Sequence, residues 1–199
     1  VYAYAKSSPG DLPMVLTRQL DPITVAPLWP DSVSLAALQA RALLDSGKAT
    51  EADMAEMSRI VEEGVRAGAL GFSTSRTVLH KSIDGELVPG TTATSEELLV
   101  IGRAMGRVGH GVFEMASDMK RDWNEFGWMG QLSRETGLPV TFAALQSIAK
   151  ELPLEEQISS MREENAKGAN IVAQIALRGN GIIMAWQGTV HPFKFKPAW

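Results

Sequence analysis

Residues 68–76 read GALGFSTSR, a glycine followed by a short apolar run and then a burst of polar side chains. The same order recurs at 109–118 (GHGVFEMASD), 137–147 (GLPVTFAALQS) and 168–178 (GANIVAQIALR). Each glycine follows a helix-like stretch, just past a helix end, where a left-handed backbone costs least without a Cβ. The apolar runs are typical of parallel strands that are covered on both faces. The repeated pattern therefore predicts helices that alternate with parallel strands.

Each apolar run ends in polar side chains, and this end indicates where a ligand binds. In barrels and open sheets of alternating strands and helices, ligands bind at the carboxyl ends of the strands. The pattern therefore predicts a candidate site along one edge of the sheet. Its members are Ser73, Thr74, Ser75, Arg76, Glu114, Asp118, Gln146 and Arg178.

The 199 residues are interpreted as a single domain. Residues 1–33 form an irregular N-terminal segment with one expected strand at 23–28, and residues 34–199 form repeating helix and strand units. The first strong strand is expected at 70–73, with a long loop at 75–93 after it. Thr50 is predicted to cap the helix at 51–67, and Thr94 and Glu97 are predicted to form a capping box ahead of the helix that follows the loop. Other helices are predicted at 34–44, 51–67, 120–136 and 153–167.

The composition excludes several classes of function. The formal net charge is −4 and no basic stripe is present, so we do not expect nucleic-acid binding. We find neither a long apolar span nor a leader-like start, and we expect a cytoplasmic protein without a membrane helix. Because the chain has no cysteine, metal ligands must come from His, Asp, Glu or modified Lys. The motifs Gly-x-Gly-x-x-Gly and Gly-x-Ser-x-Gly and the P-loop are missing.

The three histidines lie far apart in the sequence and contain no His-x-His pair, so they form no metal site by themselves. His80 lies in the long loop, where an exposed residue and a substrate contact are equally consistent with the sequence. His110 directly precedes a strand, at its amino end, and is interpreted as structural. His191 follows the last clear strand and can either face the pocket or cap a loop.

Glu114 interrupts an apolar strand, where a carboxylate is costly unless it is paired or functional. We therefore favour it over Asp118 as a site residue, with a structural pair to Arg103 or Arg107 as an equal alternative. Gln146 also interrupts a buried-looking run, and such residues most often satisfy backbone groups and only sometimes contact a substrate.

Three segments resemble the amidohydrolase superfamily, in particular its branch of N-acyl-D-amino-acid deacylases (D-aminoacylases). They are AGALGFST at 67–74, TSEEL at 94–98 and GTVHPF at 188–193. The resemblance implies a TIM-like (β/α)8 barrel, of which this chain is an internal fragment with about four to five βα units. It also implies a zinc-activated water that attacks an acyl carbonyl, and an aspartate that carries the proton to the leaving amine.

The zinc ligands that are usual in this family are not found in the sequence. The early His-x-His pair and the late aspartate are absent, and Ala116 and Ala144 stand where two strands usually end in histidine. Zinc is thus implied by the resemblance alone. Glu114 and Gln146 are expected to take the places of the lost ligands.

Together these observations predict a hydrolase that acts on a non-peptide C–N bond, the amide of an N-acyl amino acid or a similar small molecule. Arg76 or Arg178 is expected to pair with the substrate carboxylate through a bidentate fork. The isolated chain is expected to be inactive, and no catalytic residue is assigned. The alternatives are a non-catalytic barrel that keeps a small-molecule pocket, and a self-sufficient open α/β domain. The predicted substrate-binding residues are Ser73, Ser75, Arg76, His80, Glu114, Gln146 and Arg178.

Overall fold

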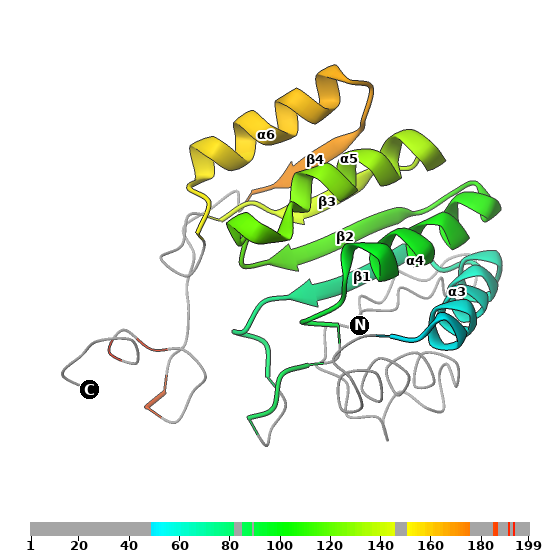
Figure 1. Cartoon of the computed structure of the whole chain (residues 1–199), viewed down its shortest axis with the longest axis horizontal. Coiled ribbons are helices and arrows are strands. Elements are labelled where there is room, and N and C mark those ends of the chain that lie inside the picture. The colour runs from blue at the N-terminus through cyan, green and yellow to red at the C-terminus, as the bar shows by residue number, and fades with distance from the viewer. Residues whose placement is uncertain are drawn as a thin grey trace, which may run out of the picture.

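The computed structural model describes residues 49–81, 85–88, 90–145, 151–175, 185–186, 191 and 193. Within these residues, four strands form one sheet in the order β1-β2-β3-β4 (Figure 1). The strands are β1 (Gly71–Arg76), β2 (Val112–Ser117), β3 (Val140–Ala143) and β4 (Ile171–Gln174). The helices are α3 (Glu51–Arg66), α4 (Ser95–Val108), α5 (Glu125–Thr136) and α6 (Leu154–Ala166), and a 3₁₀ turn, η1 (Arg121–Trp123), precedes α5.

Helices and strands alternate along the chain, and each new strand adds to the same edge of the sheet. All three neighbouring strand pairs are parallel. A doubly wound sheet reverses its strand order at a switch point, whereas a barrel adds its strands in one direction. The observed order confirms the predicted α/β class with a parallel sheet, and it is consistent with part of a TIM-like barrel.

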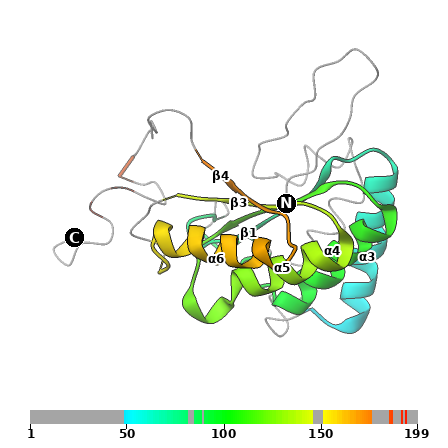
Figure 2. The ribbon, with the colours of Figure 1, turned by 90° about the horizontal axis from the view of Figure 1, so that it is seen from above.

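The four helices lie on one face of the sheet (Figure 2). Strand β1 is buried along almost its whole length, as predicted, but β2 alternates between buried and more exposed residues. The prediction that every strand is covered on both faces is therefore wrong for β2 and β4, because no described helix covers the second face. We call this second face the far face. Its residues, which follow from strand alternation and register, are Ser73, Ser75, Glu114, Ala116, Thr141, Ala143, Val172 and Gln174.

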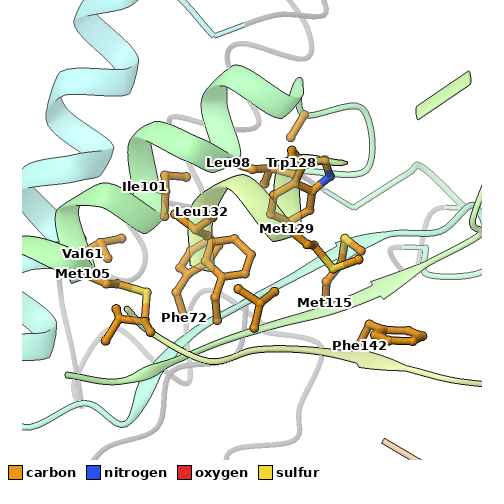
Figure 3. Packing of buried hydrophobic residues seen from close by; sticks show 14 of the residues in the cluster. Val61, Phe72, Leu98, Ile101, Met105, Met115, Trp128, Met129, Leu132 and Phe142 are labelled. Carbon is orange, nitrogen blue, oxygen red and sulfur yellow. The ribbon is translucent and has the colours of Figure 1, made fainter. Parts of the chain in front are cut away.

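The hydrophobic core lies between the sheet and the helices (Figure 3). Aromatic rings from neighbouring strands meet there: the centroids of Phe72 and Phe113 are 5.3 Å apart, and Phe113 lies 5.6 Å from Trp128 of α5. Phe72 and Phe113 alternate with the far-face residues along β1 and β2. Burial of the two rings in the core therefore determines which side chains of these strands reach the far face. Other core members are Leu98, Ile101, Met105, Met115, Met129, Leu132 and Phe142.

Short local signals set the helix ends, as the sequence predicts. Thr50 Oγ1 accepts a hydrogen bond from the Asp53 amide, and Asp53 accepts one from the Thr50 amide, which completes a capping box on α3. Thr94 Oγ1 accepts a hydrogen bond of 3.2 Å from the Glu97 amide at the start of α4, which is one half of the predicted capping box. Gly109 and Gly137 end α4 and α5 with φ angles of 86° and 72°, the left-handed backbone expected of these glycines.

The predicted helix at 120–136 is interrupted in the structure. After η1, Asn124 takes a left-handed backbone with φ of 46°, and α5 begins only at the next residue. The predicted helix at 153–167 is confirmed as α6. The expected strand at 23–28, the helix at 34–44 and the whole segment 1–33 lie outside the described residues. Among the described helices, none is long and apolar enough to span a membrane.

Neighbouring helices are joined on the outer surface by arginine–glutamate pairs. These are Arg107–Glu62 between α4 and α3, Arg103–Glu135 between α4 and α5, and Arg134–Glu164 between α5 and α6, with N–O distances of 2.8, 2.7 and 2.6 Å. Both arginines that the sequence offered as partners of Glu114 are thus engaged with helix carboxylates. The structural pairing of Glu114 with Arg103 or Arg107 is therefore wrong.

Candidate functional site

Ser73 and Glu114 form a hydrogen-bonded pair on the far face. The parallel register places Ser73 of β1 directly opposite Glu114 of β2, and the serine Oγ donates to Glu114 Oε2. Burial raises the pKa of the Glu114 carboxyl, and the hydrogen bond from Ser73 opposes this rise in part. Glu114 therefore keeps its proton to a higher pH than an exposed glutamate does.

The polar row that starts with this pair continues across the sheet. Thr141 of β3 lies opposite Glu114 in the register, and its Oγ1 accepts a hydrogen bond of 2.8 Å from Gln174 Nε2 of β4. Each described strand thus contributes to a set of polar side chains on the same face. The sequence indicated Glu114 because a carboxylate interrupts an apolar run there. The strand register explains why Ser73 and Thr141 lie next to it.

Ser75 and His80 form a second pair at the carboxyl end of β1. A turn over residues 77–80, in which the His80 amide donates to the Thr77 carbonyl over 3.4 Å, brings the histidine back toward the strand. Ser75 Oγ lies 2.6 Å from His80 Nδ1. Burial lowers the pKa of the His80 imidazole, and the Asp118 carboxylate opposes this shift. His80 is therefore partly buried and not a fully exposed loop residue, and its contact with a substrate stays a prediction.

Asp118 directly follows β2, beside the end of β1. Its carboxylate accepts a hydrogen bond from Thr77 Oγ1 and a second, of 2.9 Å, from the Val78 amide. The side chain is buried, with both carboxylate oxygens engaged. The sequence favours Glu114 over Asp118, and Thr77 is a residue of this region that the predicted site lacks. The signal for Thr77 was the alternation Ser73, Ser75, Thr77, which continues the far face beyond the strand.

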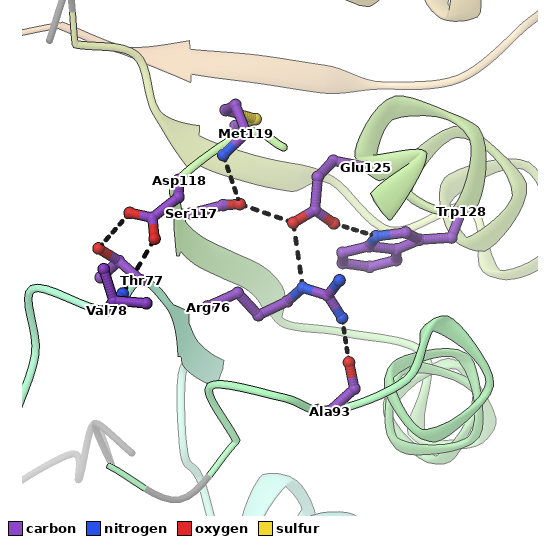
Figure 4. A network of polar contacts seen from close by, with 9 residues as sticks. All are labelled: Arg76, Thr77, Val78, Ala93, Ser117, Asp118, Met119, Glu125 and Trp128. Atoms are coloured by element: carbon purple, nitrogen blue, oxygen red, sulfur yellow. Dashed lines mark hydrogen bonds and ion pairs between the residues drawn. The ribbon is translucent and has the colours of Figure 1, made fainter. Parts of the chain in front are cut away.

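Arg76 belongs to a separate network, with Glu125 and Ala93 (Figure 4). Its Nε donates to Glu125 Oε1 over 3.0 Å, its Nη1 donates to the Ala93 carbonyl, and its guanidinium lies 4.5 Å from the ring centroid of Trp123. Successive residues of a strand point to opposite faces, so Arg76 cannot share the face of Ser75. The prediction that Arg76 lines the pocket and binds a substrate carboxylate is therefore corrected.

Glu125 completes this buried network at the start of α5 (Figure 4). Besides Arg76, it accepts hydrogen bonds of 2.6 Å from Ser117 Oγ and from Trp128 Nε1. Ser117 Oγ in turn accepts from the Met119 amide over 3.0 Å. The network ties the ends of β1 and β2 to α5, so we assign it a structural function.

Several predicted residues lie elsewhere. Gln146 and Arg178 are outside the described residues, so their predicted contacts with substrate stay predictions. His110 is exposed at the amino end of β2, in the place that the sequence indicated. Ala116 lies on the far face opposite Ser75, whereas Ala144 packs in the hydrophobic core.

The described residues do not fit a zinc site. They contain no group of three or more His, Asp or Glu side chains that could hold a metal ion. The available donors are instead engaged in pairs: Glu114 with Ser73, His80 with Ser75, and Asp118 with Thr77. A structural zinc site needs four ligands and a catalytic one needs about three. We therefore derive no chemical step through a metal.

Comparison with known proteins supports the fold. No protein-family model matches the chain, and no curated protein matches it. Among solved structures, the chain is similar to a D-aminoacylase mutant in complex with CuCl2, with a TM-score of 0.51 and 17% sequence identity. The match covers 69% of this chain and 28% of that chain. At this identity the likeness shows the fold alone, which this chain shares with part of a D-aminoacylase.

Proposed function

We propose that this chain is part of a hydrolase that cleaves the amide bond of an N-acyl amino acid or a similar small molecule. The observation that carries the proposal is a group of hydroxyl, carboxyl and imidazole side chains on one face of the parallel sheet. Ser73, Ser75, His80 and Glu114 make up this group on the far face. The likeness of fold to a D-aminoacylase supports this substrate class.

Two of these groups are suited to proton transfer. Glu114, whose pKa is raised by burial, can hold a proton and donate it to the leaving amine nitrogen. His80, whose pKa is lowered by burial, is neutral and can accept a proton from the attacking group. Ser73 and Ser75 hold these two groups by hydrogen bonds and offer hydroxyls to the substrate.

The cation that binds the substrate carboxylate is not Arg76, because that guanidinium is paired with Glu125. Arg178, the other predicted fork, remains our proposal for this contact. Zinc remains an expectation from the resemblance to amidohydrolases. The structure of the D-aminoacylase that shares the fold was solved in complex with CuCl2. This copper salt is a property of that structure and is not evidence for a metal in this chain.

We also propose that this chain is the middle portion of a longer barrel. The match spans only 28% of the D-aminoacylase chain, and the described strands number four, whereas a complete barrel of this type has eight. The 199-residue chain alone is then expected to be inactive, because it holds only part of the site. Turnover of N-acetyl-D-amino acids by the purified 199-residue chain would contradict this part of the proposal.

The test of the activity is an assay of the full-length protein with N-acetyl-D-amino acids and with their L enantiomers. We expect release of the free amine, detected by an amine-reactive dye. Replacement of Glu114 by Gln removes the proton donor and is expected to lower kcat by about 10²–10⁴-fold. The matched control is Ser159→Ala on α6, an exposed serine far from these pairs in the sequence, which should keep full activity. Full activity of Glu114→Gln would contradict the assigned role.

A second candidate function is a non-catalytic barrel that binds the same kind of small molecule. It is favoured by Ala116, which places a methyl group opposite Ser75, and by donors that are already engaged in pairs. Calorimetric titration of the full-length protein with N-acetyl amino acids tests it. Saturable binding without release of amine supports the non-catalytic candidate, and turnover rejects it.

A further inference from the structure

We propose that Ser75 and His80 form a nucleophile–base pair, through which Ser75 takes the acyl group of a substrate into a covalent ester. The proposal rests on the proposed function only for the choice of an acyl compound as substrate. It goes further because it names a nucleophile within the chain. The primary observation is the 2.6 Å distance between Ser75 Oγ and His80 Nδ1. This is within the range that a serine and its base need for proton transfer.

The local structure brings the two groups together from one short segment. Ser75 is the fifth residue of β1, and strand alternation directs it to the far face. The turn that closes between the Thr77 carbonyl and the His80 amide reverses the chain directly after the strand. The Val88 amide donates to the His80 carbonyl over 3.4 Å and so ties this turn to the next part of the loop.

The surroundings favour a neutral imidazole that can accept the serine proton. His80 is half-buried, and burial lowers the pKa of its imidazole. The Asp118 carboxylate interacts favourably with the imidazolium and would stabilise the charge that forms on His80 during proton transfer. Asp118 is itself fixed by Thr77 Oγ1 and the Val78 amide. Serine, histidine and aspartate thus cluster where two neighbouring strands end.

Small side chains lie beside the serine on the far face. Ala116 lies opposite Ser75 in the register, and Ala143 follows in the same row on β3. Both alanines are partly exposed, whereas Ser75 is 5% exposed. A row of methyl groups next to the hydroxyl suits a small apolar acyl group, such as acetyl, better than a bulky one.

The chemical step balances without a cofactor. Ser75 Oγ attacks the acyl carbon and its proton passes to His80 Nδ1. The bond from the acyl carbon to nitrogen then breaks, and the leaving amine takes the proton of Glu114. The imidazolium then loses its proton to water, and Glu114 regains a proton from water. Water hydrolyses the resulting serine ester, with His80 as the base, which releases the acid and restores the Ser75 hydroxyl.

The experiment is covalent labelling of the full chain with diisopropyl fluorophosphate. An activated serine forms a bond from its Oγ to phosphorus, while fluoride leaves and the serine proton passes to the base. We expect one label per chain, located on Ser75 by tandem mass spectrometry of the tryptic peptide that also contains Ser73. Ser75→Ala should remove the label, His80→Gln should slow labelling by about a hundredfold or more, and Ser159→Ala should leave it unchanged. No label, a label on Ser73, or a rate that is insensitive to His80 overturns the proposal.

A second variant keeps the test decisive if Ser75→Ala fails to fold. The 199 residues contain no cysteine, so Ser75→Cys adds a single thiol beside His80. A histidine next to a thiol favours the thiolate, and we expect iodoacetamide at about pH 6 to react with Ser75→Cys at least about tenfold faster than with the double variant Ser75→Cys/His80→Gln. Equal rates overturn the pair.

The labelling experiment and the amide assay test the nucleophile and the substrate class separately, so one can be rejected without the other. Amine release by a protein that fluorophosphate does not label leaves the proposed function intact and rejects Ser75 as the nucleophile. Labelling of Ser75 in a protein that cleaves no N-acyl amino acid supports the nucleophile–base pair and rejects the proposed substrate class.

Discussion

The two faces of the sheet are built from alternate residues of the same strands, yet they treat polar side chains differently. On the helix-facing side, Arg76 and Glu125 form an ion pair, and four further groups contribute hydrogen bonds to the same network. On the far face, Ser73 with Glu114 and Ser75 with His80 form pairs in which burial disfavours the charged state of Glu114 and His80. The helix-facing network thus suits stability, whereas the far-face pairs contain the groups for which we propose proton transfer.

The largest expected effect is a difference in unfolding free energy between apolar substitutions on the two faces. Phe142 is fully buried beneath the helices, and its ring meets that of Phe126 at a centroid distance of 5.3 Å. Phe142→Ala should lower the free energy of unfolding by about 4 kcal/mol, because it removes buried surface and leaves a cavity. Val172, which is 45% exposed on the far face, is the control. Val172→Ala should cost less than about 1 kcal/mol in the same urea titration. Equal costs would mean that another element covers the far face.

The next effect concerns the buried ion pair. Glu125→Ala leaves the Arg76 guanidinium charged and buried without its partner, which should cost at least about 3 kcal/mol of unfolding free energy. The double variant Arg76→Met/Glu125→Ala removes both charges and should recover part of that loss. A double-mutant cycle by urea unfolding measures the coupling. A cost below about 1 kcal/mol for Glu125→Ala would show that the buried ion pair contributes no more to stability than an exposed surface pair does.

The sequence predicted much of the fold because the decisive signals were local. Glycines after helices, apolar runs and threonine caps each depend on a few adjacent residues, and the structure confirms them at Gly109, Gly137, Thr50 and Thr94. The helix predicted at 120–136 failed because a single residue, Asn124, adopts a left-handed backbone that no local motif required.

The candidate site was harder to predict because it depends on strand ends and register. The first strand was expected to end at Ser73, but β1 continues to Arg76. The strand is thus three residues longer than expected. Arg76 lies in the strand and not in the loop, and strand alternation directs its side chain toward the helices. The contact between Ser75 and His80 depends on a turn, and the contact between Ser73 and Glu114 depends on register, and neither follows from composition.

A smaller effect tests the Glu114 carboxyl on the far face. Its pKa is raised in the folded protein by burial, so folding is favoured when the group is protonated. The stability that comes from this protonation is present below the unfolded-state pKa and is lost as the pH rises through the folded-state pKa. Glu114→Gln should therefore raise Tm more at neutral pH than at about pH 4. Ser73→Ala removes a hydrogen bond that lowers this pKa, so the pH dependence of Tm should move to higher pH.

The smallest expected effect is at the outer surface, in the pair of Arg103 and Glu135. Hydrogen bonds from Arg103 and Gln131 lower the pKa of Glu135 to about 2, but the paired side chains are 41% and 37% exposed, so water screens the attraction. Arg103→Ala should cost less than about 1 kcal/mol at pH 7 and low salt. Because the folded-state pKa is depressed, this contribution is present above the ordinary glutamate range near the value 4.5 and fades as the pH falls toward 2. Urea titrations of both proteins at pH 7 and pH 4, each with and without added NaCl, measure the difference. A cost that matches that of Glu125→Ala and resists salt would show that exposure does not weaken this pair.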